Sequence, residues 1–261
     1  MKSFNYHSAK DSKEATKLSS SASAFLAGGM TTIPSMKLGL ATYKDIIDIK
    51  NIKKLSGISV SGKSVKVGAI TKHAEVANSK EIKKAIPSLA SLAEGIGDPQ
   101  VRNRGTIGGS IANNDPSADY PSACIALNAI IHTNERKIES SKFFKGMFET
   151  VLKKGELIET IEFQIPEKSS YQKHPNPASR YAIVGVYVAK HKTGINVGVT
   201  GAKPCVYNDK EIAKVLESSF SSNSLSGVEV NSSDMNSDIH ASSEYRASLV
   251  VTQAKKAVEA C

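Results

Sequence analysis

One stretch of the chain suits neither an ordinary helix nor an ordinary strand, and it runs over residues 97–121 as GDPQVRNRGTIGGSIANNDPSADYP. Gly105, Gly108 and Gly109 permit positive φ angles and let a ligand approach the bare backbone. Arginines, hydroxyls, amides and carboxylates lie beside them, and this mixture fits a nucleotide better than a bare anion. The segment is therefore predicted to be a long binding loop, although ordinary turn chemistry also produces such a composition.

A second glycine pair follows a short apolar run. Residues 24–27 are predicted to form a buried strand, which ends abruptly at Gly28 and Gly29 and is followed by a short helix over 35–38. Backbone N–H groups at such a strand end form a seat for a pyrophosphate. Alone, a glycine pair after a strand is weak evidence.

Together, the two segments resemble the two flavin-binding motifs of the FAD-binding medium subunit of molybdenum hydroxylases. The resemblance is closest to the carbon monoxide dehydrogenase branch, is more distant for xanthine dehydrogenase, and covers essentially the whole chain. Many close relatives carry a histidine where Met30 stands, and the segment after Phe220 is unusually serine-rich. The motifs in this sequence are Ala27-Gly28-Gly29-Met30-Thr31-Thr32 and Thr106-Ile107-Gly108-Gly109.

The resemblance implies an α+β fold with a two-lobed FAD-binding domain, like that of the PCMH and vanillyl-alcohol oxidase proteins. This domain would cover residues 1–165, with α/β lobes at about 1–55 and 56–165. A smaller C-terminal domain with an antiparallel sheet and helices would cover 166–261. The residue pattern agrees, because strands predicted over 181–188 and 195–199 follow a boundary near Pro166, and a last helix is predicted from about Ser243.

The resemblance also implies which residues touch the cofactor. The dinucleotide would lie between the lobes, with each glycine motif offering backbone donors to the pyrophosphate. Ser110, Asn113 and Asp119 would lie beside it, and Ile158 and Lys173 would touch the flavin ring. Ile158 could equally be plain strand core, and Lys173 a solvated lysine.

In this family the substrate is oxidised at a molybdenum centre on a large subunit, and electrons pass through two [2Fe–2S] clusters on a small subunit to FAD and then to an external acceptor. The resemblance therefore implies an electron-transfer subunit of a heterotrimer, normally doubled, with molybdopterin and iron–sulfur cofactors on partner chains. A carbon monoxide dehydrogenase-type complex is the first expectation, and a xanthine dehydrogenase-type or other aldehyde or heterocycle hydroxylase is the alternative. A stand-alone flavin oxidase and a basic binding module remain further alternatives.

No catalytic or metal-ligating set is evident in the sequence. Cys124, Cys205 and Cys261 lie too far apart for a local iron–sulfur or zinc framework, and the histidines occur singly. The net charge is +9, but the lysines are scattered and there is no Trp, so nucleic-acid binding is not expected. No apolar run reaches the ~20 residues of a membrane span and no signal peptide is evident, so a cytoplasmic location is expected.

Residues 57–64, GISVSGKS, match the pattern of a nucleotide-binding P-loop. A P-loop lysine must begin a helix, whereas Lys63 is followed by the alternating run 65–68. The segment is therefore predicted to be a hairpin that turns at residues 61–63, and not an NTPase site.

Overall fold

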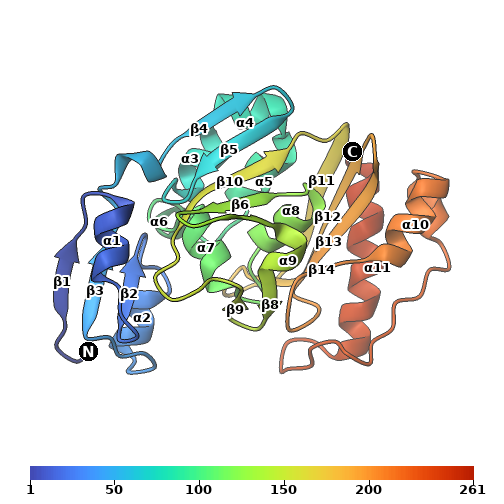
Figure 1. Ribbon diagram of the computed structural model, residues 1–261. Coiled ribbons are helices and arrows are strands. Elements are labelled where there is room, and N and C mark those ends of the chain that lie inside the picture. Colours follow the sequence, from blue (N-terminus) through green and yellow to red (C-terminus); the bar gives the residue numbers. More distant parts are fainter.

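The computed structural model describes residues 1–261, and its three main sheets occupy successive stretches of the chain (Figure 1). The first sheet is parallel, with the order β1-β3-β2, and is formed by β1 (Asn5–Ser8), β2 (Ser23–Leu26) and β3 (Asp45–Asp48). Helix α1 (Ser12–Leu18) is capped by Asp11, whose carboxylate accepts a hydrogen bond from the amide of Glu14. Helix α2 (Thr32–Lys37) follows the turn after β2.

The second sheet is antiparallel and has the order β4-β5-β10-β6-β7. Several short helices lie between its strands in sequence and pack their apolar side chains against it. The largest hydrophobic cluster of the protein lies here. The elements are β4 (Ile58–Ser61), β5 (Ser64–Gly68), β6 (Ile130–Thr133), β7 (Lys137–Glu139), β10 (Ile158–Gln164), α3 (His73–Asn78), α4 (Lys80–Ala85), α5 (Pro87–Glu94), α6 (Pro99–Arg102), α7 (Ile107–Asn113), α8 (Tyr120–Ala126) and α9 (Ser140–Phe143), with a 3₁₀ turn at Lys53–Leu55 and a small hairpin of β8 (Phe144–Gly146) and β9 (Glu149–Thr150).

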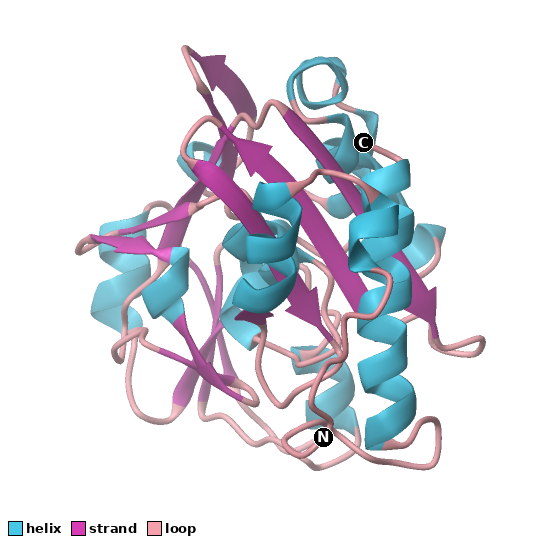
Figure 2. Ribbon diagram, turned by 90° about the vertical axis from the view of Figure 1, so that its right-hand side faces the viewer, coloured by secondary structure: helices cyan, strands magenta, loops and turns pink.

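The third sheet is antiparallel and consists of β11 (Lys168–Pro175), β12 (Ala182–His191), β13 (Gly194–Thr200) and β14 (Tyr207–Asn208). The long helix α11 (Ser243–Glu259) packs along β11 and β12 (Figure 2), and α10 (Lys210–Ser218) packs against β13. Helix α8 of the preceding region also contacts β12 and β13. Gly198 permits this contact, because a Cβ there would lie 2.2 Å from the carbonyl oxygen of Ser122. A further 3₁₀ turn covers Ser222–Leu225.

Several expectations from the sequence are confirmed by these elements. The P-loop-like segment is the hairpin of β4 and β5, and the last helix begins at Ser243. Pro87 both follows α4 and opens α5, as suits the first position of a helix. Tyr245 on α11 is 46% exposed, and its ring meets that of His174 on β11 edge to face, with 6.0 Å between the ring centroids. None of the helices is both long and apolar enough to cross a membrane.

The prediction that residues 97–121 form a loop is wrong, because the segment contains α6 and α7 and leads into α8. Thr106 caps α7 by accepting a hydrogen bond from the amide of Gly109. The glycines of this motif do not adopt positive φ angles. Gly108 is needed for close packing, since a Cβ there would lie 2.5 Å from the Cβ of Ala69. Gly108 therefore lets helix α7 pack against the end of β5, and the motif does not form a turn.

Candidate functional site

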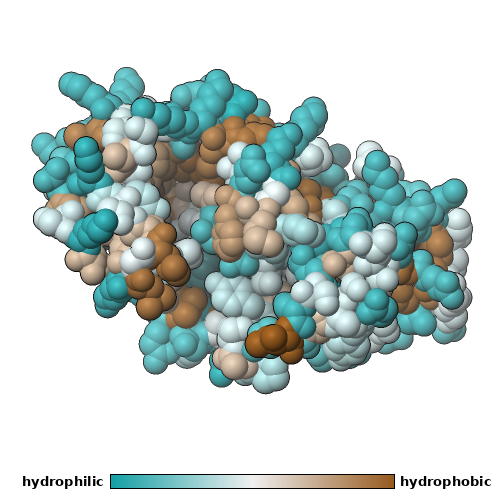
Figure 3. Space-filling view, turned by 90° about the horizontal axis from the view of Figure 1, so that it is seen from below, coloured by the Kyte–Doolittle hydropathy of each residue, from teal (hydrophilic) through white to brown (hydrophobic).

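A cavity of about 530 Å³ lies where the three parts of the fold meet, and its mouth is visible as a hollow in the space-filling view (Figure 3). Its wall combines the turn after β2, the end of β5, helix α7, the start of β10 and the loop before β12. The volume falls within the range of small-molecule and cofactor sites, ~300–1,000 Å³. The lining includes both apolar side chains and polar groups, which suits a ligand that has an aromatic part and a charged part.

The turn after β2 offers a row of free backbone donors. The N–H groups of residues 27–31 donate no hydrogen bond to another backbone group. Gly29 has a φ of +74°, which lets the chain reverse there. Gly28 packs directly on the neighbouring segment, because a Cβ at this position would lie 2.1 Å from the carbonyl oxygen of Arg104. A run of free amides beside a short helix is an anion-binding concavity.

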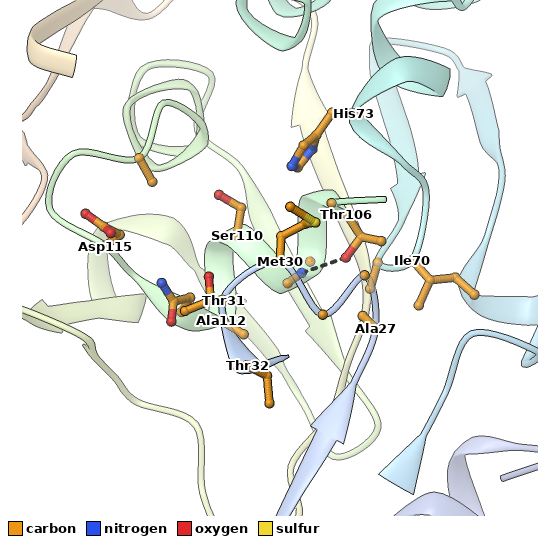
Figure 4. A pocket seen from close by; sticks show the side chains of 18 of the residues that line it. Ala27, Met30, Thr31, Thr32, Ile70, His73, Thr106, Ser110, Ala112 and Asp115 are labelled. Carbon is orange, nitrogen blue, oxygen red and sulfur yellow. Dashed lines mark hydrogen bonds between the residues drawn. The ribbon is translucent and has the colours of Figure 1, made fainter. Parts of the chain in front are cut away.

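The expectation was that both glycine motifs offer backbone N–H donors to the ligand. Helix α7 does not, because the amides at its start already donate within the protein. The amides of Ile107 and Gly108 donate to the carbonyls of Thr71 and Ala69, and the amide of Gly109 donates to Thr106 Oγ1. These donors are used within the protein. The side chains of Ser110 and Asn113 face the cavity from the same helix and form no hydrogen bond within the protein (Figure 4 labels Ser110). The helix therefore offers side-chain groups to a ligand.

Asp119 lines the cavity, but its carboxylate is already paired. The Nζ atom of Lys173 lies 2.9 Å from Asp119 Oδ1, and the hydroxyl of Tyr171 donates to the same oxygen at 2.5 Å. Lys173 is only 10% exposed and also donates to the carbonyls of Gly95 and Arg180. Lys173 is therefore neither a solvated lysine nor part of the cavity wall, and it ties the third sheet to the second part of the fold.

The structure brings most of the predicted cofactor residues together. Ile158 lies in the cavity wall beside Leu157, whereas Ile107 is fully buried in the hydrophobic cluster under α7. Ile107 and Lys173 are thus the two predicted residues that do not line the cavity. The lining ones are Ala27, Gly28, Gly29, Met30, Thr31, Thr32, Thr106, Gly108, Gly109, Ser110, Asn113, Asp119 and Ile158.

Some polar residues of the wall were missed by the sequence reasoning. His73 lies at the start of α3 and is 5% exposed, and burial lowers its pKa to about 4, with the nearby Arg102 acting in the same direction. Asp115 was expected, as one of the carboxylates in the stretch over 97–121; it lies on the same wall, and burial raises its pKa. Ser179, Arg180 and Tyr181 reach the cavity from the loop between β11 and β12. Arg180 has a φ of +62°, and its guanidinium donates to the carbonyl of Gly97.

These residues were missed because their positions depend on tertiary contacts. A lone histidine after a strand carries no pattern of its own. The close approach of Gly105, where a Cβ would lie 2.5 Å from His73 Nε2, joins residues 32 positions apart and is seen only in the structure. The cavity contains no nucleophile paired with a base, and the structure gathers no group of three or more His, Cys, Asp or Glu side chains that could hold a metal ion. Its chemistry is that of a binding site.

The cavity combines free backbone amides with apolar and hydrogen-bonding side chains, and such a lining is typical of a site for a small molecule or cofactor. Comparison with known proteins identifies the class more closely. Residues 2–167 match the family model described as the FAD binding domain in molybdopterin dehydrogenase, so the chain belongs to this family of FAD-binding domains.

The similar proteins are oxidoreductase subunits. The chain is 34% identical to the carbon monoxide dehydrogenase medium chain of Hydrogenophaga pseudoflava over 218 residues, which are 77% of this chain and 75% of that one. It is 37% identical to the glyceraldehyde dehydrogenase medium chain of Sulfolobus acidocaldarius over 170 residues, which are 63% of this chain and 60% of the relative's length. This chain is accordingly a dehydrogenase-type FAD-binding subunit, and the resemblance seen in its two motifs is confirmed.

Solved structures show the same fold over the full length. The reconstituted CO dehydrogenase from Oligotropha carboxidovorans matches with a TM-score of 0.91 at 28% identity, covering 99% of this chain and 97% of that chain. Quinoline 2-oxidoreductase from Pseudomonas putida 86 matches with a TM-score of 0.88 at 23% identity, covering 100% of this chain and 98% of that chain. The expected α+β fold class is confirmed.

Proposed function

We propose that FAD occupies the cavity, with its diphosphate on the free amides of residues 27–31. The observation that carries the proposal is this row of unpaired backbone N–H groups. They lie in a turn that packs through Gly28 against the carbonyl oxygen of Arg104. Ser110 and Asn113 provide hydrogen-bonding side chains nearby, and Leu157 and Ile158 provide an apolar surface for the flavin. Binding is noncovalent, because the cavity wall contains no cysteine and its one histidine packs against Gly105.

We propose further that the chain is the electron-transfer subunit of a molybdenum hydroxylase. FAD supplies the redox chemistry when bound, by accepting electrons from a [2Fe–2S] small subunit and releasing them to an external acceptor. The protein's own residues bind and orient the cofactor. The names of the relatives support partner chains, since they are described as medium chains of dehydrogenases. The large subunit would hold the molybdenum centre, and the complex would be a dimer of heterotrimers.

The first candidate for the complex is a carbon monoxide dehydrogenase type, since structures of that enzyme cover nearly the whole chain. The alternative is another hydroxylase of the family, because the relatives include a nicotine 6-hydroxylase medium subunit and a xanthine dehydrogenase FAD-binding subunit. The substrate would be selected on the large subunit and not in the cavity described above.

The test is reduction of the bound flavin by substrate. The chain should be co-expressed with its molybdenum and iron–sulfur partners, mixed anaerobically with carbon monoxide, an aldehyde or a purine, and followed by the flavin absorbance near 450 nm. We expect bleaching with one of these substrates in the complex, and none for the FAD-loaded chain alone. Substrate turnover by the isolated chain would support a stand-alone flavin oxidase and overturn the assignment.

A further inference from the structure

The histidine in the cavity wall has a built position. His73 is the first residue of α3, its amide donates to the carbonyl of Gly105 at 3.0 Å, and its ring packs on Tyr120 with 5.3 Å between the ring centroids. Figure 4 shows the ring above Met30 and Thr106, and His73 is one of the residues that line the cavity. The hydrogen bond of its amide and the contact of its ring with Tyr120 therefore hold His73 in place.

Gly105 connects this imidazole to the amide turn. A Cβ on Gly105 would lie 2.5 Å from His73 Nε2, and a Cβ on Gly28 would lie 2.9 Å from the Cα of Gly105. The same glycine is therefore flanked on one side by the histidine and on the other by the turn whose amides are free. The fold uses two glycines to bring the Nε2 atom of His73 beside the proposed diphosphate seat.

The ring has no hydrogen-bond partner within the protein. Its Nδ1 atom is buried without a partner, as is the hydroxyl of Tyr120. The Nε2 atom also forms no hydrogen bond within the protein but, unlike Nδ1, it is not fully buried, so it is the ring nitrogen that a ligand in the cavity can reach. Because burial and Arg102 keep the imidazole neutral, one of its nitrogen atoms carries a proton and can donate.

We propose that His73 is a cofactor-contacting residue, which donates a hydrogen bond from Nε2 to the diphosphate of the bound flavin nucleotide. This inference rests on the proposal that FAD occupies the cavity. The proton on Nε2 leaves a lone pair on the buried Nδ1 atom, which takes no part in the contact. His73 thereby adds a side-chain donor to the backbone donors of residues 27–31.

The experiment compares dissociation constants for FAD, ADP and riboflavin, measured by calorimetry. His73→Phe keeps a flat ring and removes both nitrogen atoms, whereas His73→Gln can place an amide donor close to the Nε2 position. His191→Gln is the matched control, because it removes another buried imidazole, whose Nε2–H donates to the carbonyl oxygen of Ala126 at 2.9 Å and which does not line the cavity.

We expect His73→Phe to weaken FAD and ADP about tenfold or more and to leave riboflavin unchanged, since a hydrogen bond to a charged group is lost. His73→Gln should recover most of the loss, and His191→Gln should bind as the wild type does. Unchanged FAD and ADP binding by His73→Phe would overturn the inference while leaving the FAD site intact. A wild-type protein that binds no FAD would overturn both proposals.

A second measurement on the wild type covers the case in which the variants fail to fold. In ¹⁵N spectra of the histidine side chains, ADP should shift the Nε2 resonance of His73 and leave that of His191 in place. An unmoved His73 resonance at saturating ADP would refute the contact.

Discussion

The buried pair of Asp119 and Lys173 predicts a specific energetic result. Asp119→Ala leaves the Lys173 ammonium, 10% exposed, with two carbonyl acceptors but no counter-charge, and it also removes the acceptor of the Tyr171 hydroxyl. Breaking a buried ion pair by removing one partner costs about 3–5 kcal/mol. Typical domains are stable by ~5–15 kcal/mol, so the variant should still fold but with much reduced stability.

A double-mutant cycle separates the pair from its surroundings. Lys173→Met keeps most of the side-chain volume without the charge, and we expect Asp119→Ala combined with Lys173→Met to be less destabilised than the sum of the two single variants by about 1–3 kcal/mol. The assay is urea unfolding of the apoprotein, followed by circular dichroism, with FAD loading measured in parallel. A loss below about 1 kcal/mol in Asp119→Ala, with no coupling to Lys173, would refute the view that this pair joins the third sheet to the rest of the fold.

Gly28→Ala should lower FAD occupancy and the melting temperature together, because the new methyl group would lie 2.1 Å from the Arg104 carbonyl oxygen; normal FAD loading would argue against the tight turn. Lys63→Ala, at the tip of the β4–β5 hairpin, should leave FAD binding unchanged, and a loss of nucleotide binding there would revive the P-loop interpretation. Arg136 lowers the pKa of Glu156 from 4.5 to about 2, so Glu156 stabilises the fold above pH 4.5 and this contribution, of the order of 3 kcal/mol, is lost as the pH falls toward 2. Between pH 4.5 and 2, the free energy of unfolding should therefore fall less steeply with pH for Glu156→Gln than for the wild type. Identical slopes in the two proteins would contradict this.

The parts of the fold that could be predicted are those with a strong local pattern. Alternating apolar residues in β4, β5, β12 and β13 indicated antiparallel pairs, and the spacing of apolar residues after Ser243 indicated α11. The turn after β2 was also predicted, because two glycines directly after a short apolar run leave few other possibilities.

The parts that could not be predicted depend on contacts between distant residues. Helix α7 was missed because glycines at 108 and 109 usually disfavour a helix, and only the approach of Ala69 explains Gly108. Strand β11 is rich in polar residues and lacks clear alternation. The ion pair of Lys173 with Asp119 joins residues 54 positions apart in sequence, and neither residue alone indicates it.

The central claim is that the free amides of residues 27–31 bind the diphosphate of FAD. The most direct measurement is a titration of the ¹⁵N-labelled apoprotein with FAD, followed by the backbone amide resonances. We predict that all five amides shift and become protected from exchange at one equivalent of FAD, with ADP reproducing the effect and riboflavin not doing so. Saturating FAD that leaves residues 27–31 unperturbed, while shifting amides elsewhere, would contradict the account.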